Sequence, residues 1–487
     1  MKGFVMRLSV SNLPIVLLLL SLLSIKSSAR ELTLKEAVDI ALDHTGRGAI
    51  INGQLEVAEQ YYFAERINFY VPEISINGSL PSYGTNERWG YLPGTDGKGA
   101  VREPYLDFDA DITLTQNLIT GGDLTVSADL TNQDREHPNR EGLAVEESSK
   151  LGRFNFSFTQ PILQPSAPKY DLANRKDDLE IARLTRVEES AAHEKDVIEA
   201  YIGVLQTGIK AEIGRDNYES ASLQANIDSM KLADGVISEE DWLESNSSRL
   251  DAELMQFEIK NEADEQKRLL AALLDLDVSE HLTLIEPEVT NLISEKEELD
   301  YVSLWHESIP IRKAGFEYEK AKRDADYSAS SCGLSGNFTA SYDMGRGRVE
   351  DAGIKEDLKT NSWGVKLEFS YPLWDGGASS ASVKAANLSA EQVSLEYNKA
   401  EKSAKAEIVS LINIVNVSFR KLDILKQQIG LARTKLDIAK MRFDDGQISE
   451  LTFLENRISF LQTKDNYLEE LKNYFISSVD LRSKYVS

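Results

Sequence analysis

Long stretches of the chain repeat apolar residues at a spacing of three and four positions. The clearest stretch runs from Ala404 to Phe443, with Ser418 as its single polar member. Its apolar members are Ala404, Ile408, Leu411, Val415, Leu422, Leu425, Ile429, Ala432, Leu436, Ala439 and Phe443. This spacing is typical of a coiled-coil seam. Because no proline follows Pro372, the pattern predicts one helix from about Ser379 to Asp444.

Shorter segments alternate apolar and polar residues, which is the two-residue period of a β-strand. Their apolar members are Ile74 and Ile76; Phe108, Ala110, Ile112 and Leu114; Leu124, Val126, Ala128 and Leu130; Phe154, Phe156 and Phe158; Phe338, Ala340 and Tyr342; and Val365, Leu367 and Phe369. Strands of this kind suit a barrel wall that faces lipid outside and water inside. The segment from Pro81 to Lys150, rich in Gly, Asp, Asn and Glu, is expected to be a long exposed loop plus one extra hairpin.

The sequence contains an internal repeat with an offset of 211 residues. Asp234 to Glu239 reads Asp-Gly-Val-Ile-Ser-Glu, and Asp445 to Glu450 reads Asp-Gly-Gln-Ile-Ser-Glu. Both copies continue to an aromatic residue, a Leu and a Glu at the same spacing. The same offset aligns the strand that ends at Pro161 with the one that ends at Pro372. We interpret this as a tandem duplication of a strand followed by a long helix.

Each predicted long helix ends at an Asp-Gly pair, Asp234-Gly235 and Asp445-Gly446. Glycine just past a helix is a common stop signal, and Ser238 and Ser449 are suitable N-caps for a returning helix. Each copy is therefore expected to be an antiparallel helical hairpin. The turn sequence has two open interpretations, good capping chemistry alone or a functional tip.

Acidic residues follow both turns. Asp241 and Glu244 lie three positions apart, as do Thr452 and Glu455 in the second copy, so each pair shares a helix face. If several hairpins converge around an axis, these positions would form carboxylate rings at a constriction. The alternative is an ordinary first turn in which acids favour the helix dipole.

The N-terminus has the form of a secretory signal. Residues 1–29 combine a basic start, an apolar core and the small-residue end Ser27-Ser28-Ala29. The formal net charge of −26 argues against a nucleic-acid partner. Cys332 is the only cysteine, so an intrachain disulfide is excluded.

Signals of an enzyme are weak. The five histidines are scattered, and neither a phosphate-binding glycine loop nor a Cys/His cluster is present. We therefore predict no catalytic residue, cofactor or metal site.

The expected organisation follows the repeat. We expect a signal peptide (1–29), the N-terminal helix of repeat 1 (30–70), barrel strands and extracellular loops of repeat 1 (71–165), helical hairpin 1 (166–275), a connector (276–298), the first helix of repeat 2 (299–331), barrel strands of repeat 2 (332–377), and helical hairpin 2 with the C-terminus (378–487).

Three motifs in this order resemble the TolC family of outer-membrane efflux channels. They are Tyr371-Pro372-Leu373-Trp374-Asp375-Gly376-Gly377 before a long helix, Phe443 with Gly446 before the last helix, and Asn473 to Ile476 near the C-terminus. The resemblance implies a mixed α/β membrane protein: a homotrimer whose protomers share one outer-membrane β-barrel, continued by an α-helical coiled-coil tunnel in the periplasm of a Gram-negative bacterium.

The resemblance also implies a function and partners. The chain would be a passive exit duct for small molecules or proteins, in a tripartite efflux pump or a type I secretion system, working with a periplasmic adaptor and an inner-membrane transporter. Glu455, Thr452, Glu244 and Asp241 would line the periplasmic entrance, and Gly235, Gly446, Asp234 and Asp445 would form the tips where the adaptor docks. Ile448 and Phe443 stand where the best-known member has an ionic lock, so closure here would rely on helix packing. A periplasmic coiled-coil adaptor without channel activity is the alternative.

Overall fold

The computed structural model describes residues 30–91, 97–138, 144–277, 282–289, 305–351 and 353–485. The predicted signal peptide lies outside the described residues. The chain forms two compact units. The first comprises the described residues within Met1–Gly53, Thr185–Ile309 and Lys402–Ser487, and the second comprises those within Gln54–Leu184 and Pro310–Glu401.

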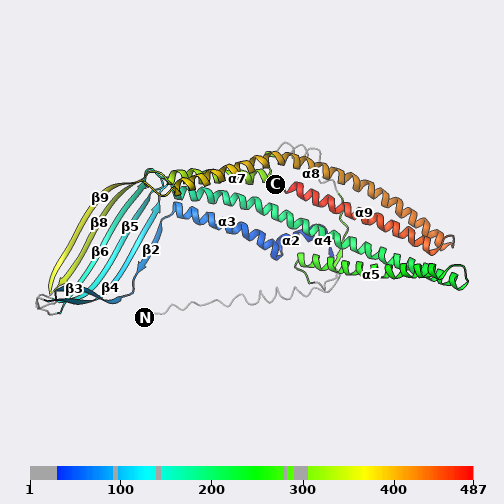
Figure 1. Cartoon of the computed structure of the whole chain (residues 1–487), viewed down its shortest axis with the longest axis horizontal. Coiled ribbons are helices and arrows are strands. Elements are labelled where there is room, and N and C mark those ends of the chain that lie inside the picture. Colours follow the sequence, from blue (N-terminus) through cyan, green and yellow to red (C-terminus); the bar gives the residue numbers. More distant parts are fainter. Residues whose placement is uncertain are drawn as a thin grey trace, which may run out of the picture. The chain divides into compact units, whose positions relative to one another are not determined.

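Most of the described chain is helical (Figure 1). The helices are α2 (Leu34–Asp43), α3 (Gly46–Tyr70), α4 (Ala167–Ala233), α5 (Glu239–Leu273), a short 3₁₀ helix η1 (Trp305–Glu307), α7 (Ile309–Ser331), α8 (Ala378–Asp444) and α9 (Glu450–Arg482). Helices α4 and α8 each contain 67 residues and begin and end 211 positions apart. The duplication seen in the sequence is therefore a duplication of structure.

The first helix of repeat 2, expected over residues 299–331, needs correction at its start. Residues 299–304 lie outside the described residues, and α7 begins at Ile309, so Pro310 is inside its first turn. Proline is tolerated there because the first N–H groups of a helix have no intrahelical acceptor. Among the described residues, no helix combines the length and apolar character needed to cross a bilayer.

The strands form two sheets. In the first unit, β1 (Arg30–Leu32) pairs in parallel with β7 (Leu282–Leu284). In the second unit, seven antiparallel strands follow the order β2-β4-β5-β6-β8-β9, with β3 also paired to β4. They are β2 (Glu73–Gly78), β3 (Ser82–Tyr91), β4 (Lys98–Asn117), β5 (Asp123–Pro138), β6 (Ala144–Pro161), β8 (Ser335–Asp351) and β9 (Ile354–Ser370).

The six strands predicted from alternation are all present, but the expected loop from Pro81 to Lys150 is wrong. Most of that segment belongs to β3, β4, β5 and β6. Residues with weak strand propensity, such as Asp107, Asp109 and Asp111, alternate with apolar residues along β4 and are held in register by β5. Pairing with neighbouring strands outweighs intrinsic propensity at such positions.

The first unit has a continuous apolar core between helices of both repeats. The predicted seam of α8 contributes Ile408, Val415 and Leu422, packed with residues of α4 and α9 such as Tyr201 and Leu471. Ser418, the polar member of the seam, is also buried. The apolar seam of α8 therefore packs within the same chain, against α4 and α9.

Polar contacts also join the two repeats inside this unit. Lys195 of α4 lies 2.6 Å from Asp480 of α9, and Gln206 donates to Glu469 at 3.0 Å. The buried hydroxyl of Tyr201 lies 2.6 Å from the carbonyl oxygen of Leu32 and accepts a bond from the N–H of Ile285. Burial raises the pKa of Tyr201 to about 12, so it stays a neutral hydrogen-bonding group.

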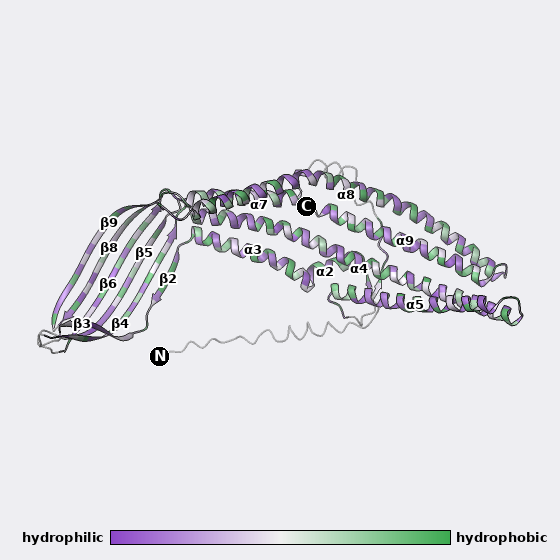
Figure 2. Ribbon diagram, in the orientation of Figure 1, coloured by the Kyte–Doolittle hydropathy of each residue, from purple (hydrophilic) through white to green (hydrophobic). Residues whose placement is uncertain are grey.

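The large sheet has one apolar and one polar face in the second unit. Figure 2 shows apolar and polar positions alternating along its strands. Phe156 of β6 lies opposite Val126 of β5 and Tyr342 of β8, whereas the next residue, Ser157, lies opposite Thr125 and Ser341. The apolar side chains remain exposed in the single chain, among them Trp363 at 79% and Val365 at 60%.

Candidate functional site

Both helical hairpins turn in the same way, and in Figure 1 both end on the same side of the first unit. The N–H of Gly235 donates to the carbonyl of Leu232 at 3.0 Å, and the N–H of Val236 donates to that of Lys231 at 2.8 Å. Gly446 and Gln447 make the equivalent bonds in the second hairpin, at 2.9 and 2.7 Å. These pairs define Schellman motifs.

The φ angles of Gly235 and Gly446 are +71° and +68°. No heavy atom lies within 4 Å of the place where a Cβ would stand at either residue. The glycines are thus required by backbone conformation and not by crowding. The neighbouring residues Asp234 and Asp445 are exposed at the two turns.

The serines after the turns cap the returning helices, as the sequence predicts. Ser238 Oγ accepts from the N–H of Asp241 at 3.2 Å, and Asp241 accepts from the N–H of Ser238 at 3.0 Å. The Ser238 hydroxyl also donates to the Asp241 carboxylate at 2.7 Å, and this bond, followed by the one from the Ser238 N–H, lowers the pKa of Asp241. Ser449 Oγ likewise accepts from the N–H of Thr452 at 3.2 Å. Asp241 and Thr452 therefore have an observed structural role in capping.

Glu244 and Glu455 lie one turn further along and are exposed. They occupy equivalent positions of the two repeats, on α5 and α9. Neither is part of a cap, so the capping explanation of the tip acids does not extend to them. Phe443, at the end of α8, stacks on Phe453, at the start of α9, with ring centroids 5.3 Å apart. This aromatic contact joins the two helices next to the second turn.

A buried carboxylate below the first turn was not predicted. Asp228 accepts bonds from Gln224 at 2.8 Å, Lys231 at 3.0 Å and the hydroxyl of Ser245 on α5. The Ser245 bond is the largest of the causes that lower the pKa of Asp228 to about 2. The equivalent position in the second repeat is Ala439, a seam residue. Aligning the repeats would have revealed this polar replacement in an apolar seam.

A second unpredicted group links the two repeats. Asp216 of α4 is fully buried, and its Oδ2 atom lies 3.1 Å from Nε of Arg457 on α9. Arg215 lies 3.5 Å from the other carboxylate oxygen. Arg457 follows Glu455 by two residues, so the start of α9 is fixed to α4 by charge as well as by packing.

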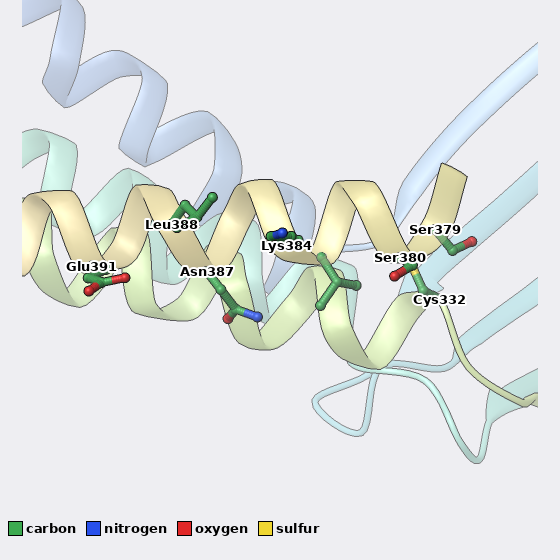
Figure 3. Close-up of a pocket in the computed structure, with 8 residues that line it drawn as sticks. Cys332, Ser379, Ser380, Lys384, Asn387, Leu388 and Glu391 are labelled. Carbon is green, nitrogen blue, oxygen red and sulfur yellow. The ribbon is translucent and has the colours of Figure 1, made fainter. Parts of the chain in front are cut away.

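Outside the hairpin tips, the described residues include few groups suited to catalysis or ligand binding. An open pocket of about 530 Å³ in the second unit is lined by Cys332, Ser379, Ser380, Val383, Lys384, Asn387, Leu388 and Glu391 (Figure 3). It holds one thiol and one amine without a histidine. No group of three or more His, Cys, Asp or Glu side chains within the described ranges is placed to bind a metal ion.

Comparison with known proteins agrees with this architecture. Residues 308–484 match the family described as "Outer membrane efflux protein". The fold matches VceC of Vibrio cholerae with a TM-score of 0.56 and 14% identity, covering 91% of this chain and 95% of that one. It matches CmeC of Campylobacter jejuni with a TM-score of 0.58 and 14% identity, covering 93% and 85%. No curated protein matches in sequence.

Residues 308–484 thus match the outer membrane efflux protein family, the TolC family, and the described chain as a whole has the fold of its channels. It is a channel protein of the outer membrane of a Gram-negative bacterium and not an enzyme. The alternative of a periplasmic adaptor is therefore wrong. The fold of this efflux protein is the expected one of long helical hairpins and membrane-type strands, built on an internal repeat.

Proposed function

We propose that this efflux protein works as a homotrimer: a passive exit duct that receives cargo from an inner-membrane transporter through a periplasmic adaptor. The observation that carries the proposal is the family match at residues 308–484 together with the fold. CmeC of Campylobacter jejuni and MtrE of Neisseria gonorrhoeae, whose folds this chain shares, are outer membrane channels. Small molecules or proteins remain alternative cargoes, because the transporter that selects them is another chain.

Exposed apolar stripes on the helices support association with further copies. Helix α8 presents Val417, Ile424, Leu431 and Ile438 at intervals of seven residues, each between 48% and 73% exposed. Helix α5 presents Leu243, Leu250 and Phe257 at the same interval, between 50% and 61% exposed. Seven-residue apolar stripes are coiled-coil seams. In the proposed trimer the α8 stripe of one copy packs against the α5 stripe of the next.

The sheet supports the same assembly, since β2 and β9 end it without a further partner among the described strands. An open edge in lipid leaves backbone groups without hydrogen bonds, so strands from several copies must close it. The assembly is tested by crosslinking in native outer membranes and by heat-modifiable migration. A ladder that ends at trimer is expected. A ladder that ends at dimer, or recovery in the soluble periplasm, contradicts the proposal.

The hairpin turns are proposed as the periplasmic tips on which the adaptor docks. Replacing Gly446 by valine is expected to abolish pump-dependent export while trimers still form. A β-branched residue at φ +68° costs about 1–2 kcal/mol and distorts the turn. Export of a fluorescent substrate and co-purification with the adaptor measure the effect.

Gly430→Val is the matched control for the tip variant. Gly430 lies inside α8, is exposed, and has no heavy atom within 4 Å of its Cβ position. Valine is accommodated there in helical geometry, so export should be unchanged. If Gly446→Val exports as well as Gly430→Val, the turn is not a docking surface.

Glu244 and Glu455 are proposed to form two acidic rings at the periplasmic entrance, with Thr452 and Asp241 adjoining them. Like carboxylates held close together attract cations, and salt screens the effect. Glu455→Ala is expected to lower cation preference and block by multivalent cations in a planar bilayer, without loss of trimers. Glu258→Ala, an exposed acid further along α5, should leave selectivity unchanged. Unchanged selectivity in both Glu455→Ala and Glu244→Ala would show that the two acids face elsewhere.

A further inference from the structure

The first repeat contains about 50 residues that the second lacks. Helices α4 and α8 begin 211 positions apart, and β5 and β8 begin 212 apart, at Asp123 and Ser335. Helices α3 and α7, in contrast, end 261 positions apart, at Tyr70 and Ser331. The additional residues therefore lie between the end of α3 and the start of β5, and they form β2, β3 and β4.

These additional strands belong to the same sheet as the strands shared by both repeats. Strand β4 pairs with β5 continuously from Tyr105–Arg135 to Asn117–Asp123. Strands β2 and β3 follow one another along the other side of β4. A tight turn joins β4 to β5, in which Gly121 has a φ of +88° and the N–H of Leu118 donates to the carbonyl of Gly122 at 2.8 Å. Because β2 and β3 together occupy one strand position beside β4, the sheet is six strands wide.

The two faces of the sheet continue across the added strands without a change of register. One apolar row runs through Ile74, Leu114, Val126, Phe156, Tyr342 and Trp363. The neighbouring polar row runs through Ser75, Thr113, Ser127, Asn155, Asp343 and Ser362. A hairpin that plugged a water-filled lumen would not need an apolar face matched to the wall. The added strands have the two-faced pattern of wall strands.

The two edges of the sheet are suited to pair with each other between copies. Strand directions alternate from β2 to β9, so β2 and β9 are antiparallel. Joining the β9 edge of one copy to the β2 edge of the next therefore keeps the alternation around a closed ring. Both edges carry exposed apolar side chains of the same face, Ile74 at 65% and Trp363 at 79%.

We propose that three copies close into a barrel of eighteen strands, not the twelve that one hairpin per repeat would give. This inference rests on the proposed trimer. Barrel diameter grows roughly linearly with strand number, so the added hairpin widens the barrel about 1.5-fold. Barrels of this strand number enclose an aqueous channel. The outer-membrane part would then pass bulky or polypeptide cargo, and β4 would add Asp107, Asp109 and Asp111 to its polar lining.

Deleting the added strands tests the width. Residues Val71 to Gly122 are replaced by Ser-Gly-Leu, which is the Cys332–Leu334 link between α7 and β8 with serine in place of the cysteine. In planar bilayers, the largest polyethylene glycol that enters from the barrel side should have a radius smaller by about one third. The cut-off from the helical-tip side should not change. An equal or larger cut-off from the barrel side overturns the proposal.

Cysteine labelling of the full chain tests the same point without a deletion. In a Cys332→Ser background, a water-soluble maleimide should modify Thr113→Cys on β4 and leave Ile112→Cys unmodified. Phe156→Cys and Ser157→Cys on β6 form the matched control pair, of which only Ser157→Cys should react. If the β6 pair shows this contrast and the β4 pair reacts equally, the widened barrel is wrong and the channel stands. If neither pair shows it, the shared barrel of the proposed function fails too.

Discussion

Replacing Arg457 by methionine is expected to destabilise the helical unit by about 3 kcal/mol. The change removes the cation 3.1 Å from Asp216, whose side chain is fully buried. An uncompensated buried carboxylate costs several kcal/mol, and Arg215, 3.5 Å away, offsets only part of this. The effect is measured as a lower midpoint for heat-induced loss of the helical circular dichroism signal in detergent.

Two further variants distinguish the effect of breaking the buried ion pair from the effect of removing any arginine side chain. Arg433→Met removes an exposed arginine of α8 and should change stability by no more than about 0.5 kcal/mol. Asp216→Leu combined with Arg457→Met replaces both partners by apolar groups and should recover most of the loss. If the double variant is as unstable as Arg457→Met alone, packing of the arginine stem and not the buried charge explains the loss.

Replacing Leu431 by aspartate is expected to prevent trimer formation. Leu431 is 73% exposed in the single chain and lies in the middle of the α8 stripe, and the proposed trimer would bury it in each copy. Burying a carboxylate without a partner is far more costly than exposing it, so the variant should remain as separate chains. Crosslinking in native membranes and native gel electrophoresis measure the outcome.

The control for this variant introduces the same charge off the stripe. Lys440 is an exposed residue nine positions after Leu431, on the opposite side of α8. Lys440→Asp should form trimers like the unmodified protein, because the new carboxylate stays in water. Normal trimers in Leu431→Asp would show that the α8 stripe faces neither a neighbouring copy nor the assembly interior, and the proposed packing against α5 would be abandoned.

The sequence alone determined the helical part of this protein closely. Periodicity and the absence of proline predicted α8 from Ser379 to Asp444, and the helix spans Ala378–Asp444. The Asp-Gly turns and the caps at Ser238 and Ser449 were predicted too. These features depend on residues close in sequence, through helix hydrogen bonds, left-handed glycine and side-chain caps. Local chemistry suffices for them.

Only the tertiary structure decided the width of the sheet and the polar contacts between repeats. Strand β3 and most of the segment from Pro81 to Lys150 have a composition typical of loops, and pairing with β4, β5 and β6 orders them. The partners Asp216 and Arg457 are 241 positions apart, so no local pattern relates them. Strand pairing and burial of charge depend on contacts between segments that are far apart in the sequence. The spacing of residues within one segment does not specify which distant segment it contacts.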